Sequence, residues 1–407
     1  MPFAAFVAPY LLEATVRFVD SAARLDGVDL AVITHEKADH LAPQLRDALV
    51  AHWRIEDALD PVQLVEAVRG LSSQAGRPVE RLLGVLEQAQ VPIAQARQAL
   101  GMHGMHAEVA TNFRDKNRMK DVLRAAGIPV ARHRLVGAPE DALAFAAEVG
   151  FPLVVKPPAG AGARSTFRLD DGDAMLRWIE ASPPSFANPT LVEEFLTGEE
   201  FTFDSVMLHG KVVWYSIARY FPAPLEVLHN PWMQWAVVLP RDVSGPEFDD
   251  IRRIGPAALE ALGLDTGLSH MEWFRRADGT VAVSEVGARP PGAQITSALS
   301  YAHDMDVYRE WPRLMLLDQF NPPQRQWAVG VVYLRGQGVG RVVAVHGVEE
   351  VQRDIGDLVV ESKLPQVGQA PSGTYEGEGY VIVRHAETDG VMDALGRILT
   401  GVRVELG

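Results

Sequence analysis

GLSHMEWFRRADGTVAVSEVGARP, residues 267–290, is the stretch that decides the fold of this chain. Two apolar runs flank Asp278-Gly279, a dipeptide that favours the two-residue turn of a β-hairpin. If these two residues form the turn, Glu272 stands directly opposite Glu285, with Cβ atoms about 5 Å apart. A longer turn with a bulge would shift the pairing by one residue and make the two glutamates diagonal neighbours. Either arrangement predicts two carboxylates close together.

Like charges directly opposite each other destabilise a sheet, so the hairpin needs something that offsets their repulsion. Arg289 follows shortly after Glu285, and carboxylates that converge in a cleft suit a divalent cation. Mg²⁺ is the natural candidate, since it takes one or two carboxylates and leaves its other positions to water and substrate phosphates. Taken alone, the hairpin is better explained by two solvated glutamates on a polar face. Only the rest of the chain favours a metal site.

The composition indicates an ordinary globular protein of roughly two to three domains. The 407 residues are 47% hydrophobic and 22% charged, and Lys+Arg 38 against Asp+Glu 53 gives a net charge of -15. This charge argues against nucleic-acid binding through a basic surface, so an anionic substrate needs a locally basic pocket. The absence of cysteine excludes disulfides, thiolate metal sites and a cysteine nucleophile. No stretch is long and apolar enough to span a bilayer, and no signal peptide is recognisable, so we expect a cytoplasmic protein.

The first 111 residues predict an α/β domain. Phe3–Ala8 and Asp29–Thr34 have the pattern of buried strands on either side of a helix, which makes a parallel βαβ unit. The first turn after a strand lacks Gly-x-Gly-x-x-Gly, which argues against a dinucleotide site and leaves a scaffold or substrate support. A helical pattern follows from Val79 to Gln88. A domain boundary is expected near Thr111.

A strand that ends in a lysine precedes a loop of small residues in the middle of the chain. Phe151 to Lys156 is apolar, and the following segment, residues 157–166, reads PPAGAGARST. Its free backbone N–H groups could cradle phosphates. The segment lacks the Gly-Lys-Ser/Thr ending of a P-loop, and a surface hairpin with a snorkelling lysine is the common explanation of any single instance.

A dense acidic cluster forms the next motif. A strand ends at Val192, an extended hinge with Glu193 and Glu194 follows, and a second strand begins at Phe201. Exposed carboxylates at such a hinge suit hydroxyl or amine donors, such as a ribose or an adenine amino group. A charge run of this kind is more often a solvated turn. From Trp327 onward the pattern is β-rich.

Four motifs occur in one order: Lys116; Lys156 with its glycine loop; Val192–Leu196 with Gly198-x-Glu200; and Glu272…Glu285-x-Gly287-x-Arg289. Together they resemble the ATP-grasp superfamily, specifically its carboxylate–amine ligases, over roughly residues 112–320. His270-x-Glu272 and the form of the C-terminal region are most similar to the L-amino acid ligase branch. The resemblance implies an α/β and α+β protein with a Rossmann-like N-terminal α/β domain (1–111), a two-lobed ATP-grasp domain (112–325) and a small β-rich α+β C-terminal domain (326–407).

The resemblance also implies a role for individual residues. Those implied to bind ATP are Lys116, Lys156, Ser165, Glu193, Glu194, Phe195, Leu196 and Glu200, with the two lysines at the phosphates, the loop Gly160–Ser165 as a lid, the backbones of Glu194 and Leu196 at the adenine edge, and Glu200 at the ribose. Glu272 and Glu285 would ligate the metal, and Arg289 and Lys156 would be catalytic. His270 and Arg219 are candidates for the acceptor pocket. The family usually has Asn at the position of Gly287, so one metal ligand is missing here.

The implied reaction uses ATP with Mg²⁺, or Mn²⁺ as a second candidate, and forms an amide or peptide bond. A carboxylate attacks the γ-phosphoryl group, an amine attacks the resulting acyl phosphate, and ADP and phosphate leave. The partners are a small carboxylate and an amine, such as amino acids, and many relatives are homodimers. Two alternatives stay open: an ATP-grasp carboxylase or phosphotransferase, and a non-catalytic ATP-binding protein. The second alternative is considered because Gly287 replaces the usual Asn and so removes a metal ligand.

Overall fold

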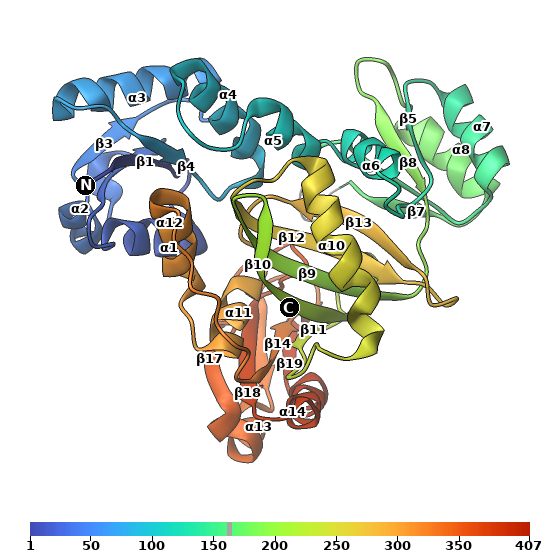
Figure 1. Ribbon diagram of the computed structural model, residues 1–407. Coiled ribbons are helices and arrows are strands. Elements are labelled where there is room, and N and C mark those ends of the chain that lie inside the picture. The colour runs from blue at the N-terminus through green and yellow to red at the C-terminus, as the bar shows by residue number, and fades with distance from the viewer. Residues whose placement is uncertain (161–164) are drawn as a thin grey trace.

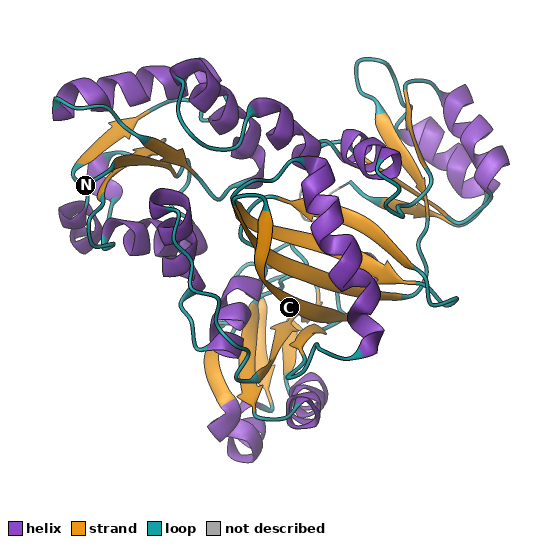
Figure 2. Ribbon diagram, viewed as in Figure 1, coloured by secondary structure: helices purple, strands orange, loops and turns teal. Residues whose placement is uncertain are grey.

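The computed structural model describes residues 1–160 and 165–407, which form four β-sheets with helices packed around them. In Figure 1 the N-terminal region (blue) and a small sheet (green-cyan, with α7 and α8) lie on opposite sides of a large central sheet. Figure 2 shows helices on the outside of each sheet. The mixed α/β class predicted from the sequence is confirmed.

Four parallel strands form the N-terminal sheet in the order β3-β2-β1-β4: β1 (Phe3–Val7), β2 (Asp29–Thr34), β3 (Ala51–Arg54) and β4 (Arg81–Leu83). Its helices are α1 (Glu13–Ala23), α2 (Pro43–Ala48), α3 (Pro61–Ala75), α4 (Gln90–Leu100) and α5 (Ala107–Arg114). The predicted parallel βαβ unit is confirmed. The helix predicted over Val79 to Gln88 is wrong, because Leu82 and Leu83 pair with β1 as strand β4, and a 3₁₀ turn, η2 (Glu87–Ala89), follows.

The small sheet is antiparallel and has the order β5-β8-β6-β7: β5 (His133–Val136), β6 (Leu153–Lys156), β7 (Phe167–Leu169) and β8 (Thr190–Glu194). Helices α7 (Pro139–Val149) and α8 (Gly172–Ala181) cover it, and Phe145, Met175 and Trp178 from these helices fill its core. Helix α6 (Lys116–Ala125) precedes the sheet. Its N-cap is Asp115, whose carboxylate accepts from the N–H of Arg118, as a helix start requires.

The central sheet has eight antiparallel strands in the order β13-β12-β9-β10-β11-β14-β18-β17: β9 (Glu199–Leu208), β10 (Lys211–Phe221), β11 (Trp235–Leu239), β12 (Gly267–Arg275), β13 (Val281–Gly287), β14 (Ala328–Leu334), β17 (Val359–Lys363) and β18 (Gly379–His385). Helix α10 (Asp249–Leu262) packs on one face through Ile251, Ile254 and Leu259. Gly255 permits this close approach, since a Cβ there would lie 2.7 Å from the ring of Phe203.

The remaining elements are α9 (Pro224–His229), α11 (Ile295–His303), α12 (Val307–Leu317), β15 (Gly336–Gly338), β16 (Val342–His346), α13 (Val348–Ile355), α14 (Thr388–Gly401), β19 (Arg403–Leu406) and the 3₁₀ turns η1 (Ala38–His40), η3 (Pro246–Phe248) and η4 (Gly356–Leu358). Strands β15, β19 and β16 form the fourth sheet, which is short and lies near the C-terminus. Helix α14 packs on β14 and β18 through Val391, Leu395 and Ile398.

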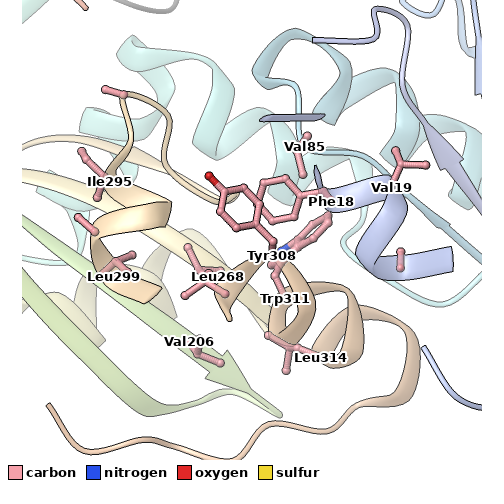
Figure 3. Close-up of a cluster of buried hydrophobic side chains, with 14 of the residues drawn as sticks. Phe18, Val19, Val85, Val206, Leu268, Ile295, Leu299, Tyr308, Trp311 and Leu314 are labelled. Carbon is pink, nitrogen blue, oxygen red and sulfur yellow. The ribbon is translucent and has the colours of Figure 1, made fainter. Parts of the chain in front are cut away.

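One hydrophobic cluster joins the N-terminal region to the rest of the chain. Figure 3 shows Phe18 of α1 against Tyr308 and Trp311 of α12, with ring centroids 4.7 and 5.3 Å from that of Phe18. Leu268 of β12 and Val85, which follows β4, belong to the same cluster. Buried aromatic contacts of this kind stabilise an interface beyond their buried area, so α1 and α12 hold the N-terminal sheet beside β12.

The hairpin of β12 and β13 places Glu272 directly opposite Glu285, and it does so with the longer of the two turns that the sequence left open. The N–H of Arg276 donates to the carbonyl of Thr280, so the turn is one residue longer than Asp278-Gly279 alone. Arg275 therefore pairs with Val281, and the register shifts again before Glu272 pairs with Glu285. Ser284 is the extra residue of this bulge, and it cancels the effect of the longer turn.

The two predicted domain boundaries fall at different kinds of position. Residue 111 lies inside α5, and residue 326 lies just before β14, which pairs with β11 and so extends the central sheet into the C-terminal region. Both boundaries stay predictions. Among the described helices, none has both the length and the apolar character needed to cross a bilayer.

Candidate active site

A cavity of about 680 Å³ lies between the small sheet and the central sheet. This volume is typical of small-molecule sites, which enclose roughly 300–1,000 Å³. The predicted site residues that line it are Lys116, Lys156, Glu193, Glu194, Phe195, Leu196, Glu200, His270, Glu272, Glu285 and Arg289. The structure thus brings together side chains from α6, β6, β8, β9, β12 and β13 that are up to 173 residues apart (289 minus 116).

Helix α6 supplies two lysines on one face. Lys116 Nζ lies 2.8 Å from Glu285 Oε1 and donates to the carbonyl of Gly160 at 3.1 Å. Lys120, one helical turn later, has a 1% exposed side chain and donates to the carbonyl of Ser284 at 2.6 Å. The bulge in β13 therefore presents a carbonyl oxygen that anchors a buried ammonium group.

Glu193 on β8 holds two ammonium groups at the cavity. Its carboxylate forms an ion pair with Lys156 Nζ, and its other oxygen lies 3.1 Å from Lys120 Nζ. Burial alone would raise the pKa of Glu193, but Lys120 and Lys156 outweigh burial and lower that pKa to about 2. Burial likewise opposes the charge of Lys156, while Glu193 and Glu285 raise its pKa. Both groups of this pair are therefore charged at neutral pH.

The two opposed glutamates have different partners. Glu285 pairs with Lys116, and although burial opposes its charge, Lys116 and Lys156 lower its pKa. Glu272 Oε1 accepts a hydrogen bond of 3.3 Å from the hydroxyl of Tyr220. Burial, and next the charge of Glu272, raises the pKa of Glu200 well above its usual value. Three carboxyl groups thus lie close together in the cavity, and Glu200 is the one whose charged form is disfavoured.

This region suits a divalent cation. Within residues 1–160 and 165–407, no group of three or more His, Asp or Glu side chains is arranged as a ready metal cage. Mg²⁺ does not need one, since it is usually bound by one or two carboxylates together with water and substrate phosphates. The carboxylates of Glu272 and Glu285 and the repulsion felt by Glu200 fit a cation that arrives with a nucleotide.

His270 on β12 is held as a charged imidazolium. It faces Asp204 of β9, with 2.6 Å between His270 Nδ1 and Asp204 Oδ1, and its Nε2 lies 3.7 Å from Glu272 Oε1. Burial lowers the pKa of His270, but Asp204 and then Glu272 raise it to about 10. His270 therefore donates hydrogen bonds at neutral pH and does not act as a base.

Arg289 is held in the cavity by a residue of the N-terminal region. Its guanidinium pairs with the carboxylate of Glu87 in η2 and donates to the carbonyl of Pro290 at 2.9 Å. Glu87 also lies next to Gly287: a Cβ on that glycine would stand 3.6 Å from Glu87 Oε2. A carboxylate thus occupies space beside the position where the resemblance leads us to expect an Asn side chain.

The hinge after β8 presents a backbone donor to the cavity that no described residue satisfies. The side chain of Glu194 is engaged by Arg132 Nε at 2.7 Å and Arg276 at 3.2 Å, and its N–H donates to the carbonyl of Arg132. In the described part of the chain, the N–H of Leu196 has no acceptor, although Leu196 lines the cavity. A planar base edge with an acceptor nitrogen would satisfy this donor.

Two predicted site residues lie elsewhere. Arg219 does not line the cavity: it pairs with Glu199, its guanidinium lies 4.4 Å from the ring centroid of Phe221, and its neighbour Tyr220 lines the cavity instead. Adjacent residues of a strand point to opposite faces, so Tyr220 faces the cavity while Arg219 faces away from it. Ser165 is exposed and does not line the cavity. Most of the predicted lid, residues 161–164, lies outside the described residues.

Several residues at the site were missed from the sequence: Glu87, Tyr220 and Tyr375 line the cavity, and Lys120 and Asp204 are buried behind it, in contact with Ser284 and His270. Lys120 carries a usable signal, because it lies four residues after Lys116 and hence on the same face of α6. Asp204 follows Thr202 in the inward alternation of β9, and it is fully buried. Glu87 and Tyr375 lie before and after the predicted ATP-grasp domain, and the sequence around each of them contains none of the motifs described above.

Comparison with known proteins finds sequence similarity to an ATP-binding domain model and to proteins named as ligases. A family model of the carbamoyl-phosphate synthase L chain ATP-binding domain matches residues 115–201. An L-arginine-specific L-amino acid ligase of Bacillus subtilis is 25% identical over 296 residues, which cover 70% of this chain and 68% of the relative. An alanine–anticapsin ligase of Bacillus subtilis strain 168 is 29% identical over 245 residues, 54% of this chain and 50% of the relative. The alignments thus span half to about two thirds of these relatives.

Solved structures share the fold over the whole chain. A crystal structure of an L-amino acid ligase from Bacillus licheniformis has a TM-score of 0.80 at 19% identity, with 100% of this chain and 99% of that chain covered. N5-carboxyaminoimidazole ribonucleotide synthetase from Thermotoga maritima has a TM-score of 0.72 at 17% identity, with both chains fully covered. At these identities the likeness shows the fold.

Proposed function

We propose that the chain is a member of the ATP-grasp carboxylate–amine ligase family and that it joins a carboxylic acid to an amine with ATP as the activating substrate. The carboxylate attacks the γ-phosphorus of ATP, the bond to ADP breaks, and an acyl phosphate forms. The amine then attacks the acyl carbon, phosphate leaves, and one proton is released. The products are an amide, ADP and phosphate.

One observation supports this proposal above the others: ammonium groups and opposed carboxylates lie side by side in one cavity. Lys116 Nζ is 2.8 Å from Glu285 Oε1, and Glu272 stands opposite Glu285. Without nucleotide, Lys116 neutralises Glu285. In the proposed complex, Lys116 exchanges that carboxylate for a phosphate oxygen, and Glu285 becomes available to the cation. Bound Mg²⁺ would supply positive charge at the β- and γ-phosphates, where Glu272 and Glu285 would hold it.

The remaining groups position and neutralise the reacting phosphoryl group. Lys156, held by Glu193, points its ammonium group into the cavity, and Arg289, held by Glu87, provides a second fixed cation. Fixed charges of this kind need no reorganisation during the reaction, which is the main way that proteins accelerate phosphoryl transfer. Exclusion of water matters as well, because water would hydrolyse an acyl phosphate.

We assign the substrates to amino acids or other small carboxylates and amines. The part of the cavity beyond His270 and Arg289 has an aromatic and aliphatic wall that includes Tyr220, Trp235, Ile295 and Tyr375. A wall of this kind accepts the side chain of a small substrate, while the charged groups bind its carboxylate and ammonium ends. The two ligases of Bacillus subtilis named above support this class. A cytoplasmic reaction and a homodimeric assembly are part of the same proposal.

A screen of ADP and phosphate release tests the proposal. We expect release with Mg²⁺-ATP only when both a carboxylic acid and an amine are present, with amino-acid pairs as the first panel. Release with a carboxylate and bicarbonate, or with a single phosphoryl acceptor, would identify another ATP-grasp reaction. ATP binding without turnover on any panel would favour a non-catalytic protein.

Substitutions in the cavity separate the proposed roles from general damage. Glu285→Ala and Lys156→Ala should each abolish ADP formation while the protein stays folded. Lys363→Ala is the control, since Lys363 is exposed and pairs with Glu13, away from the cavity. ADP formation near the parent rate in either cavity variant would count against the assigned roles.

A further inference from the structure

A second, much smaller cavity of about 20 Å³ lies away from the proposed active site. Arg81 of β4, Arg97 of α4, His103 and Gly104 after α4, Thr266 before β12, and Asp318 after α12 contribute to its lining. It therefore lies where the N-terminal sheet meets α12 and the start of β12. None of its residues belongs to the proposed ligase site.

The side chain of Arg97 is buried, and its Nε has no hydrogen-bond partner among the described residues. Its residue is 5% exposed, and in the described part of the chain no acceptor lies within hydrogen-bond distance of its Nε, which is fully buried. No carboxylate of the described chain forms an ion pair with it. Burial lowers the pKa of Arg97 to about 10, which still leaves the group charged at neutral pH. An uncompensated buried charge is strongly destabilising, so a compensating group must be present.

The rest of the lining leaves positive charge in excess. Asp318 is its one acidic side chain in the described residues, and it is already engaged by Arg81 at 3.1 Å. Arg81 Nε is itself buried without an acceptor. Gly104 lies against the guanidinium: a Cβ there would come within 2.4 Å of Arg97 Nη1. The absence of a side chain at Gly104 therefore leaves room for the guanidinium of Arg97, whose charge no described acidic side chain neutralises.

The size of the cavity limits what compensates the charge. A water molecule needs roughly 10–15 Å³ of such volume, so about 20 Å³ holds one water or one monatomic ion and excludes a phosphate or a nucleotide. Water would satisfy N–H groups but would leave the charge unneutralised. We propose that the cavity is a binding site for one chloride ion, held by Arg97 and Arg81 with His103 beside them. The ion would tie α4 to the end of α12.

Anomalous diffraction tests the site directly. Crystals of the full chain grown with sodium bromide in place of chloride should show one anomalous peak within hydrogen-bond distance of Arg97. A water molecule at that place with no anomalous signal, or an Arg97 side chain turned to a protein carboxylate, would overturn the proposal. This experiment needs no variant, so it stays decisive if substitutions at Arg97 prevent folding.

Thermal unfolding gives the matched solution test. The melting temperature of the parent should be higher in sodium chloride than in sodium gluconate at equal ionic strength, by about 1–2 °C, because chloride binds only the folded chain and gluconate is too large. Arg97→Met should lose this difference. Arg253→Met, which removes an exposed guanidinium that pairs with Asp250, should keep it. An equal chloride effect in the parent and Arg97→Met would refute the site.

Discussion

The carboxylate of Glu87 contacts the guanidinium of Arg289 across 202 residues of sequence. Glu87 belongs to the 3₁₀ turn that follows β4 in the N-terminal sheet, whereas Arg289 follows β13 of the central sheet. Burial lowers the pKa of Arg289, but Glu87 more than offsets this effect and raises it. The N-terminal region therefore takes part in the active site through a fixed ion pair.

Glu87→Gln tests this ion pair. The amide keeps the shape of the side chain but removes the charge that fixes Arg289, so we expect kcat to fall by about 10- to 100-fold. The KM for ATP should change little, because Lys116 and the hinge after β8 do not contact Glu87. Steady-state kinetics would measure both constants. Glu56→Gln, at an exposed residue that pairs with Arg54, is the control. A parent-like kcat in Glu87→Gln would show that Arg289 needs no such support.

Gly287→Asn should strengthen metal binding. A Cβ at Gly287 would have its nearest neighbours at 3.6–3.9 Å, which is ordinary contact, so a side chain can be added. The new amide oxygen would lie on the same face of β13 as Glu285 and add a ligand, and we expect Mn²⁺ to bind several-fold more tightly in the presence of ADP. Electron paramagnetic resonance of free Mn²⁺ would measure this. Gly287→Ala fills the space without a ligand, and an equal gain in that variant would disprove the explanation.

Lys120→Met should lower the free energy of unfolding more than the same substitution of an exposed lysine does. The side chain lies between the carbonyl of Ser284 and the carboxylate of Glu193, and its removal leaves Glu193 with Lys156 alone. Loss of one partner from a buried ion pair costs about 3 kcal/mol of unfolding free energy. Urea unfolding would measure the loss. Lys363→Met serves as the exposed counterpart, and a similar small effect in both variants would mean that the buried pair contributes little.

Because His303 is buried, we expect the folded protein to lose stability in mild acid. Burial lowers its pKa to about 4, with Arg325 as a second cause, and the ring packs edge-on against Trp214 at 4.9 Å. The folded state therefore favours the neutral ring. This stabilisation is fully present above the unfolded pKa of about 6.5 and is lost as the pH falls towards 4, by at most about 1.4 kcal/mol per pH unit.

Unfolding free energies measured from pH 7.5 to 4.5 would check the prediction. His303→Phe keeps an aromatic ring in the core but cannot bind the proton, so its stability should fall less steeply with acid than that of the parent. His346→Phe, at an exposed residue, should follow the parent. Parallel curves for the parent and His303→Phe would rule out His303 as the cause.

The opposed glutamates show what could be predicted from the sequence and why. Strand alternation and the apolar runs around residues 278–279 gave the correct faces, and the pairing of Glu272 with Glu285 is confirmed. The hairpin has the longer of the two turns considered, and Glu272 still lies opposite Glu285 because the bulge at Ser284 compensates for the extra turn residue. The carbonyl of Ser284 in the bulge accepts a hydrogen bond from Lys120, a distant partner that hairpin rules do not include.

Residues that reach the site from another region were beyond the reach of pattern analysis. Glu87 lies in a segment whose apolar spacing resembles a helix, and only pairing with β1 turns it into a strand and a turn. Arg219 was chosen instead of Tyr220 because the face of β10 depends on its neighbours in the sheet. The motif residues themselves, from Lys116 to Arg289, do line one cavity, and their individual roles stay predictions.

The pairing of β11 with β14 has a practical consequence for anyone who wishes to cut this protein into parts. A fragment that stopped at residue 325 would expose one whole edge of β11, whose five residues Trp235–Leu239 are all buried in the intact chain. Unprotected apolar edges recruit strands from other molecules, so such a fragment should aggregate when expressed. The fragment would also lack Tyr375, which lines the cavity. Because β11 and β14 pair with each other, chimaeras with relatives should exchange these two strands together.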